Sequence, residues 1–342
     1  MSNKKYNDIF DYFKKNDKEI IDFQGILGEG AFGKVRLCFY GKKICAAKLV
    51  EREKSGKIDP EKLRGKNIIE IIKISQRKIE DKYYDLIIME MALLRDIKTF
   101  IKNLFNFKLL KTINWPFDEI VGNNILRFFT KQIVNGMETL ERNELAHFDI
   151  KPENILITSE LTIKLSDFSF LKDLNQEKNS VIIPGGTKGY VPPEYYDKYI
   201  VDSNLAKKHD YFALGATLYY LKFNKPLLKY NDASSKEFTN IHVINLLQKS
   251  ISLLKSNLLL DKDFISFLCS LVDYLPQERP NFEQIYRNKW LNENSEEIRE
   301  ITNSYYQSDE RKLIMELIKS DFLIEKKKKN KNIKKSRFHF VK

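Results

Sequence analysis

Short runs of apolar, aromatic and β-branched residues dominate the chain between residues 23 and 91. Three of these runs occupy residues 34–40, 44–50 and 84–90. Runs of this length and composition are typical of β-strands. The pattern therefore predicts a small, mainly antiparallel sheet in this part of the chain.

After Met91 the apolar residues recur with the period of an amphipathic helix. Residues 125–140 show this spacing, and residues 240–260 show it again. The pattern predicts an α+β protein in which a strand-rich lobe, residues 23–91, precedes a larger helix-rich lobe, residues 92–291.

The two ends of the chain differ from both lobes. Residues 1–22 form a polar N-terminal extension, and residues 292–342 are expected to hold a helical segment and a basic tail. Four apolar or aromatic residues of the extension would share one face of a short helix that packs on the main domain. They are Ile9, Phe10, Tyr12 and Phe13.

Composition narrows the class of protein. Of the 342 residues, 42% are hydrophobic and 31% are charged, as in ordinary globular proteins. The sequence holds no apolar run long enough to cross a membrane and no apolar signal core, so we expect a cytoplasmic protein. Cys38, Cys45 and Cys269 show no CxxC spacing, and we interpret them as packing residues rather than as a disulfide framework or a zinc site.

The net charge of +12 is unevenly distributed. Nine Lys or Arg residues and no acid lie between Lys326 and Lys342, and the rest of the chain is close to balanced. The plainest interpretation is a solvated tail, and a nuclear import signal is the alternative. Nucleic acid is not an expected partner.

A glycine-rich segment, residues 28–35, joins two predicted strands. Its three glycines, Gly28, Gly30 and Gly33, would let backbone N–H groups approach phosphate oxygens. A glycine-rich hairpin without a ligand is the alternative. A dinucleotide-binding site would need a helix directly after the glycines, whereas the residues from Val35 onward favour another strand.

Lys48 lies within the apolar run 44–50. A buried ammonium group is costly unless an anion meets it, and nucleotide phosphates would be that anion. The alternative is a lysine on the solvent face of an edge strand.

The segments 147–154 and 167–169 bring together the residue types that phosphoryl transfer needs. Asp149 supplies a carboxylate for a substrate hydroxyl, and Lys151 supplies a cation for the γ-phosphate. Asn154 and Asp167 supply oxygen ligands for Mg²⁺.

The order and spacing of these segments resemble the signature of protein kinases. Residues 186–194 and 210–215 extend the resemblance, with Asp210 bracing the catalytic loop and Arg279 as the partner of Glu194. The resemblance implies a two-lobed protein kinase-like fold over residues 23–291, ATP and Mg²⁺ as cofactors, and protein substrates with Ser/Thr acceptors. Lys151 and Thr187 are similar to the serine/threonine group.

Carried over residue by residue, the resemblance implies catalytic roles for Lys48, Asp149, Lys151 and Asn154 and metal binding by Asn154 and Asp167. It implies that the purine lies between apolar side chains next to a gatekeeper, a hinge and a ribose-binding acid. The implied nucleotide-binding residues are Leu27, Gly28, Glu29, Gly30, Ala31, Phe32, Gly33, Val35, Ala46, Lys48, the gatekeeper Met89, the hinge residues Glu90 and Met91, Asp96 for the ribose, and Leu156.

The segment after Lys48 departs from the family pattern. Only 14 residues separate Lys48 from Leu63, so the helix expected here must be short or irregular. Its glutamate should pair with Lys48, and the spacing does not choose among the candidates. They are Glu51, Glu53 and Glu61.

Three substitutions fall within the signature, namely Phe148 for arginine, Ser169 for glycine and Pro192 for alanine. Phe148 removes the cation that receives activation-loop phosphate, and we expect it to pack on Val181, Ile182 or Ile183. Ser169 should stiffen a hinge. Together with the short helix, Ser169 motivates an alternative function, a pseudokinase that acts as a nucleotide-binding scaffold.

Overall fold

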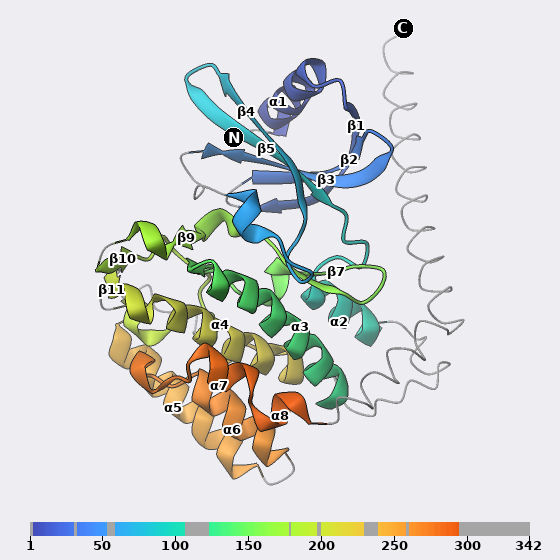
Figure 1. The fold of residues 1–342 in the computed structure, drawn as a ribbon. Coiled ribbons are helices and arrows are strands. Elements are labelled where there is room, and N and C mark those ends of the chain that lie inside the picture. The colour runs from blue at the N-terminus through green and yellow to red at the C-terminus, as the bar shows by residue number, and fades with distance from the viewer. Residues whose placement is uncertain are drawn as a thin grey trace, which may run out of the picture.

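A strand-rich lobe and a helix-rich lobe make up the computed structural model (Figure 1). This confirms the fold class expected from the change in apolar period. The residues that the structure describes are 3–30, 33–52, 59–106, 123–177, 179–196, 200–228, 239–257 and 260–293.

The smaller lobe is a five-stranded antiparallel sheet with the order β1-β2-β3-β5-β4. Both faces of β3 are covered, since every residue from Cys45 to Glu51 is buried. This burial explains the continuous apolar run in the sequence. The strands are β1 Ile20–Gly30, β2 Gly33–Tyr40, β3 Lys43–Glu51, β4 Ile71–Ile79 and β5 Lys82–Glu90.

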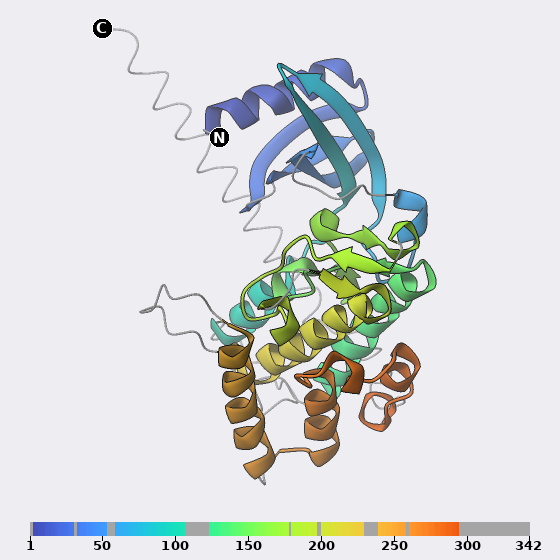
Figure 2. The same cartoon turned by 90° about the vertical axis from the view of Figure 1, so that its left-hand side faces the viewer.

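Helix α1 (Asn3–Asn16) lies across this sheet, away from the helical lobe (Figures 1 and 2). Ile9, Phe10 and Phe13 are buried among β3 and β5 residues, as predicted. The prediction is wrong for Tyr12, which is 42% exposed because it points away from this face of the helix. Ala47 and Leu49 belong to the same cluster, so α1 covers the face of β3 opposite to Lys48.

The connection between β3 and β4 holds a single turn of 3-10 helix, Pro60–Leu63, within residues 59–70. This agrees with the short or irregular element expected there, although residues 53–58 of the connection lie outside the described residues. Leu63 and Ile68 are buried in the core of the larger lobe, and the backbone N–H of Ile69 donates to the carbonyl of Leu165 at 2.9 Å. The connection is therefore fastened to the helical lobe.

The larger lobe packs its helices around one apolar core. Helix α4 is buried along most of its length because other elements surround it. The predicted helices at 125–140 and 240–260 correspond to α3 and α5. The helices are α2 Ile97–Asn106, α3 Asn123–Arg142, α4 Ser203–Phe223, α5 Asn240–Ser256, α6 Lys262–Leu271, α7 Phe282–Tyr286 and α8 Lys289–Asn292.

Three two-stranded ribbons belong to the larger lobe. They pair β6 (Leu145–Ala146) with β9 (Lys172–Asp173), β7 (Ile155–Ile157) with β8 (Ile163–Leu165), and β10 (Ser180–Ile182) with β11 (Ile200–Asp202). Asp149 and Asn154 lie between β6 and β7, and Asp167 lies between β8 and β9.

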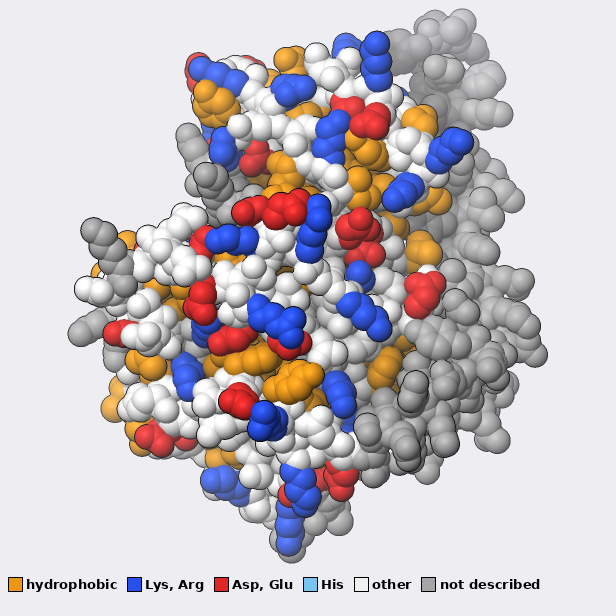
Figure 3. All heavy atoms as spheres, in the orientation of Figure 1, with side chains coloured by type: hydrophobic (Ala, Val, Ile, Leu, Met, Phe, Trp, Pro, Cys, Tyr) orange, Lys and Arg blue, Asp and Glu red, His pale blue; other side chains and the backbone are white. Residues whose placement is uncertain are grey.

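Surface features of the described residues agree with the balanced charge outside the tail. On the face in Figure 3, Lys and Arg side chains alternate with Asp and Glu over both lobes. Cys38 and Cys45 are buried opposite each other in β2 and β3, and all three cysteines are free. Among the described helices, none is long and apolar enough to cross a membrane.

Candidate active site

The loop after β6 is held in place by Asp210 of the buried helix α4. Its carboxylate accepts hydrogen bonds from the backbone N–H groups of His147 at 2.6 Å and Phe148 at 2.8 Å. These bonds fix a sharp turn in which Phe148 has a φ of +60°. Burial raises the pKa of Asp210 to about 6, although both hydrogen bonds favour its charged form. The predicted bracing role of Asp210 is confirmed.

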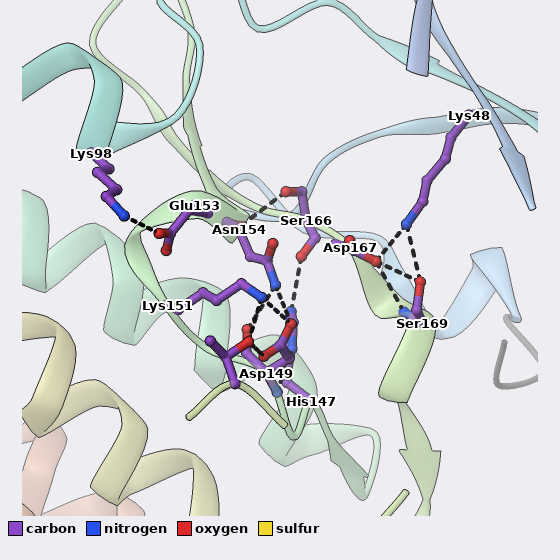
Figure 4. A network of polar contacts seen from close by, with 11 residues as sticks. Lys48, Lys98, His147, Asp149, Lys151, Glu153, Asn154, Ser166, Asp167 and Ser169 are labelled. Carbon is purple, nitrogen blue, oxygen red and sulfur yellow. Dashed lines mark hydrogen bonds and ion pairs between the residues drawn. The ribbon is translucent and has the colours of Figure 1, made fainter. Parts of the chain in front are cut away.

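Asp149 is the centre of a cluster of polar side chains (Figure 4). Its side chain is 4% exposed. Oδ1 accepts from Thr187 Oγ1 at 2.6 Å, and Oδ2 accepts from Lys151 Nζ at 2.7 Å and from Asn154 Nδ2 at 2.8 Å. Lys151 Nζ also donates to Thr187 Oγ1 at 2.6 Å. The cluster brings together the base, the phosphate lysine and the threonine that the sequence suggested.

Asn154 uses its amide nitrogen within this cluster. Nδ2 donates to the backbone carbonyl and to Oδ2 of Asp149, both at 2.8 Å. Its side-chain carbonyl oxygen is thereby left for another ligand. Ser166 donates from its N–H and its Oγ to the Asn154 carbonyl, both at 2.9 Å, so the loop is tied to the strand that leads to Asp167.

Asp167 lies opposite Lys48 of β3 and adopts the left-handed conformation, with φ +61° and ψ +71°. Lys48 Nζ lies 2.5 Å from Asp167 Oδ1. Burial alone would raise the pKa of Asp167, but the charge and hydrogen bond of Lys48, together with Ser169, lower it to about 2. The carboxylate is therefore ionised at neutral pH.

The oxygens of Asp167 and Asn154 fit a magnesium ion. Lys48 and Ser169 both contact Asp167 through Oδ1, so the described contacts leave Asp167 Oδ2 available to a metal ion. The side-chain amide oxygen of Asn154 is available in the same way. No group of three or more His, Cys, Asp or Glu residues suited to a metal occurs in the described part of the chain. Mg²⁺ in phosphoryl-transfer sites usually takes one or two protein ligands and completes its shell with water and phosphate oxygens.

The expected glutamate partner of Lys48 is not found among the described candidates. Glu51 pairs with Lys82, and Glu61 pairs with Arg64. Glu51 follows Lys48 by three positions in one strand, so the two side chains point to opposite faces of the sheet. Both expectations are therefore wrong, and Glu53 lies outside the described residues.

The glycine-rich hairpin is formed by the end of β1 and the start of β2. Gly28 lies opposite Val35, and Gly30 lies opposite Gly33. Leu27 and Glu29 also belong to β1, and Ala31 and Phe32 lie outside the described residues. A Cβ at Gly33 would come within 1.9 Å of the Leu49 carbonyl oxygen, so close approach of β3 requires this glycine.

Side chains of the predicted purine pocket come from both lobes. Ala46 of β3 lies opposite Met89 of β5, and Val35 of β2 lies opposite Lys48. Leu156 belongs to β7 in the larger lobe and is half-buried. Strand pairing thus brings the small-lobe residues of this pocket together.

The hinge and the ribose-binding acid are anchored by other contacts. The N–H of Glu90 donates to the Glu70 carbonyl at 3.0 Å, and the half-buried Met91 directly follows β5. Asp96 caps α2, because its two oxygens accept from the N–H and the hydroxyl of Thr99, both at 2.8 Å. The adenine and ribose contacts stay predictions.

Comparison with known proteins decides the family. The family model of the protein kinase domain matches residues 21–291. The chain belongs to the protein kinase domain family.

Several curated kinases are similar to this chain. The carbon catabolite-derepressing protein kinase of Candida tropicalis is 30% identical over 171 residues, which cover 49% of this chain and 26% of that protein. The serine/threonine-protein kinase PKH2 of Saccharomyces cerevisiae is 37% identical over 114 residues, 30% of this chain and 10% of that protein. The 3-phosphoinositide-dependent protein kinase B of Dictyostelium discoideum is 26% identical over 294 residues, 81% of this chain and 29% of that protein. The matched part of the chain spans less than a third of the length of each of these three proteins.

Phe148 packs in an apolar cluster of this kinase domain with Val181 and Ile183, as predicted. The prediction is wrong for Ile182, which is 60% exposed. Residues of β10 alternate between the two faces of the ribbon, so Val181 points inward and Ile182 outward. The cluster also holds Leu174 and Ala206.

Arg279 and Glu194 form the predicted pair in the larger lobe of the kinase domain. The guanidinium donates from NH1 to Oε1 at 2.6 Å and from NH2 to Oε2 at 2.8 Å. Glu194 lies in a 3-10 turn, Pro193–Tyr196, and Arg279 follows another, Pro276–Glu278. The pair connects parts of the lobe that are far apart in sequence.

Ser169 contributes more to the site than the sequence analysis predicted. Its hydroxyl donates to Asp167 Oδ1 at 2.6 Å and accepts from Lys48 Nζ at 3.0 Å. The available signal was a hydroxyl two residues after a carboxylate, a spacing that allows local hydrogen bonds. Its contact with Lys48 depends on a strand more than a hundred residues earlier and is invisible locally.

Proposed function

We propose that this protein transfers the γ-phosphate of Mg-ATP to serine or threonine hydroxyls of protein substrates. The observation that carries the proposal is the cluster of Asp149 with Lys151, Thr187 and Asn154, next to Asp167 and Lys48. In phosphoryl transfer the protein mainly positions groups and stabilises charge. This buried cluster can position the reacting groups and stabilise their charge.

Each residue of the cluster has a distinct part in the proposed reaction. Asp149 would orient the substrate hydroxyl and accept its proton, since a carboxylate retains a free lone pair after its three contacts here. Lys151 would balance the negative charge of the transferred phosphoryl group, and Lys48 would hold the other phosphates. Mg²⁺, held by Asp167 and Asn154, would neutralise charge on the phosphate oxygens.

A scaffold that binds nucleotide without transferring phosphate has less support. The described residues keep the base with Lys151 and Asn154 in one group of hydrogen bonds and Lys48 with Asp167 in a second (Figure 4). Ser166 bonds to Asn154 and directly precedes Asp167, so the two groups adjoin. Neither Phe148 nor Ser169 removes any of these groups. The serine/threonine specificity is supported by Lys151 and Thr187 and by the similarity to the serine/threonine-protein kinase PKH2.

Transfer of labelled phosphate tests the proposal. Purified protein would be incubated with γ-labelled ATP, Mg²⁺ and a generic basic protein, alongside an Asp149→Asn variant. We expect incorporation on serine or threonine, and a loss of about 10²–10⁴-fold in the variant because general-base catalysis contributes that much. Equal incorporation in both proteins would contradict the assigned role. ATP binding without any transfer would favour the scaffold.

Peptide arrays would then identify the residues preferred around the acceptor. Serine and threonine arrays, with tyrosine arrays as the matched control, test the proposed acceptor class directly. Preferential phosphorylation of tyrosine would contradict it.

A further inference from the structure

Within the described part of the connection after β3, no glutamate pairs with Lys48. Its side chain is 11% exposed, and its described partners are Asp167 and Ser169. An ammonium group has three donor hydrogens and is costly to bury without acceptors. If Asp167 binds a metal ion, another group is needed to hold Lys48 near the nucleotide phosphates.

The described glutamates of β3 and of the connection after it are not placed to hold Lys48. Glu51 lies on the opposite face of β3 and pairs with Lys82. Glu61 lies on the 3-10 turn, pairs with Arg64, and its side chain is 68% exposed. Neither carboxylate approaches Lys48.

The hydroxyl of Ser169 has the geometry for this task. It accepts from Lys48 Nζ at 3.0 Å while donating to Asp167 Oδ1 at 2.6 Å, and so bridges the two charged groups (Figure 4). Ser169 is 6% exposed, so water would not readily replace the hydroxyl. The backbone N–H of the same residue also donates to Asp167 Oδ1, at 3.3 Å, and glycine would keep only that bond.

We propose that Ser169 is a positioning residue for the phosphate-binding lysine. Its hydroxyl helps to hold Lys48 in place, because it can keep its contact with Lys48 when Asp167 turns to a metal ion. The inference rests on the proposed function, in which this site binds Mg-ATP. Ser169 thus has a function in the site in addition to the restriction of backbone conformation expected when serine replaces glycine.

A double-mutant cycle of binding affinities tests the inference without relying on turnover. Calorimetry would measure the Kd of adenylyl imidodiphosphate with Mg²⁺ for the full chain and for Ser169→Ala. The same two measurements would be repeated with Lys48→Met, once with Ser169 intact and once with Ser169→Ala. We expect Ser169→Ala to weaken binding about tenfold when Lys48 is present, since hydrogen bonds to charged groups are strong, and less than about twofold when it is absent.

Matched variants separate positioning from general damage to the fold. Ser169→Thr keeps a hydroxyl and should restore most of the affinity, whereas Ser169→Gly should resemble Ser169→Ala and serves as the second variant if alanine disturbs folding. Ser270→Ala removes a helix hydroxyl that bonds the Phe267 carbonyl, far from the site, and should leave Kd unchanged.

Three outcomes would overturn the inference. An equal loss in both Lys48 backgrounds would mean that the serine acts on the fold. An unchanged or tighter Kd in both Ser169→Ala and Ser169→Gly would mean that its hydroxyl does not help Lys48 to hold phosphate. Failure of the wild-type protein to bind the nucleotide would overturn the proposed function and this inference with it, whereas the first two outcomes leave the proposed function standing.

Discussion

Arg279 has every side-chain nitrogen engaged in a fully buried position. It forms the two-pronged pair with Glu194, and its Nε donates to the Asp273 carbonyl at 2.8 Å. The guanidinium also lies 5.1 Å from the centre of the Phe212 ring. A planar guanidinium suits this arrangement of acceptors better than any other side chain.

Removing Arg279 should therefore destabilise the protein strongly. In Arg279→Ala the Glu194 carboxylate, whose side chain is 20% exposed, loses its partner. We expect the free energy of unfolding to fall by about 3–5 kcal/mol, as for other broken buried pairs. Urea unfolding measures this, with Arg287→Ala as the control. Arg287 forms an exposed pair within one helix and should cost less than about 1 kcal/mol. A similarly small effect for Arg279→Ala would contradict the buried pair.

His209 is a second buried group with an unusual environment. Both ring nitrogens lack a hydrogen-bond partner among the described residues, and the ring packs edge-on against Phe148 at 5.1 Å between centroids. Burial, with a smaller effect of the Arg279 charge, lowers the pKa of His209 to about 3. The folded protein therefore keeps this histidine neutral.

This neutral histidine should make stability depend on pH. Its folded pKa of about 3 lies below the ordinary value of 6.5, so between these values only the unfolded chain binds the proton. The free energy of unfolding should consequently fall as pH decreases from 6.5 towards 3. From pH 7 to pH 5 the wild type should lose about 2 kcal/mol more than His209→Leu, since each pKa unit corresponds to about 1.4 kcal/mol.

Denaturant unfolding at several pH values measures this difference. The pKa of Asp210 is raised to about 6 and has the opposite effect on stability, but Asp210 is present in both proteins and its contribution largely cancels. Parallel curves for wild type and variant would contradict the assignment.

The sequence predicted the site residues that belong to motifs and missed those defined by tertiary contacts. Asp149, Lys151 and Asn154 fall in one short segment, so their proximity follows from local spacing. Glu51 and Glu61 were wrong candidates for the partner of Lys48, because that pairing depends on how a whole connection folds. His209 gave no signal, since burial of one ring depends on several elements at once.

At the scale of elements, the apolar pattern predicted strands β2, β3 and β5 and helices α3 and α5. It could not show where the connection between β3 and β4 lies. Leu63 and Ile68 were visible as apolar residues, but their burial against α3 and β8 depends on packing between lobes. Helix α1 was predicted from its apolar face, and only Tyr12 was misplaced.

The ribbon of β10 and β11 is held by apolar packing rather than by charge. Phe148 occupies the position next to the base where the family has arginine, and it is fully buried with Val181 and Ile183. Arginine at this position would need a phosphate to balance its charge, whereas phenylalanine gains free energy from burial alone. The loop is thus positioned without a phosphate group.

We therefore predict activity without phosphorylation of the activation segment. Phosphatase-treated protein and Ser180→Ala should show initial rates within about twofold of untreated enzyme. Neither treatment changes the apolar contacts of Phe148 with Val181 and Ile183. Thr187 is unsuitable as a test site, since its hydroxyl bonds Asp149 and Lys151.

Phe148→Ala is the matched disruption and should lower both the initial rate and the stability, since truncation of a buried phenylalanine costs about 3–5 kcal/mol. A loss of tenfold or more on phosphatase treatment, reversed by rephosphorylation, would show that a phosphate does position the loop.

On the scale of the whole molecule, the site joins the two lobes. Lys48 comes from the sheet, and Asp149, Asn154 and Asp167 come from the helical lobe. A second ion pair between the lobes joins Glu90 to Lys164 at 2.7 Å. The sequence predicted both lobes from their apolar periods, while these contacts between them required the fold.

Because Mg-ATP would contact residues of both lobes, it should stabilise the molecule as one unit. A ligand at 100 times its Kd adds about 2.7 kcal/mol to the free energy of unfolding, which corresponds to a rise in Tm of roughly 5 °C for a protein of this size. Differential scanning calorimetry with ATP and Mg²⁺, and with ATP and a chelator, measures this rise and its dependence on the metal.

The magnesium-dependent part of that rise should disappear in Asp167→Ala. The variant lacks the carboxylate that we assign to the metal, whereas Asn154 would contribute a neutral amide oxygen that binds Mg²⁺ more weakly. Part of the rise with ATP alone should persist, because Lys48 still meets the phosphates and no longer has a competing carboxylate at 2.5 Å. Lys48→Met should lose the larger share of the stabilisation by ATP alone. An Asp167→Ala protein whose Tm still responded to Mg²⁺ as the wild type does would show that the metal binds through other residues, and the assignment of Asp167 would then be wrong.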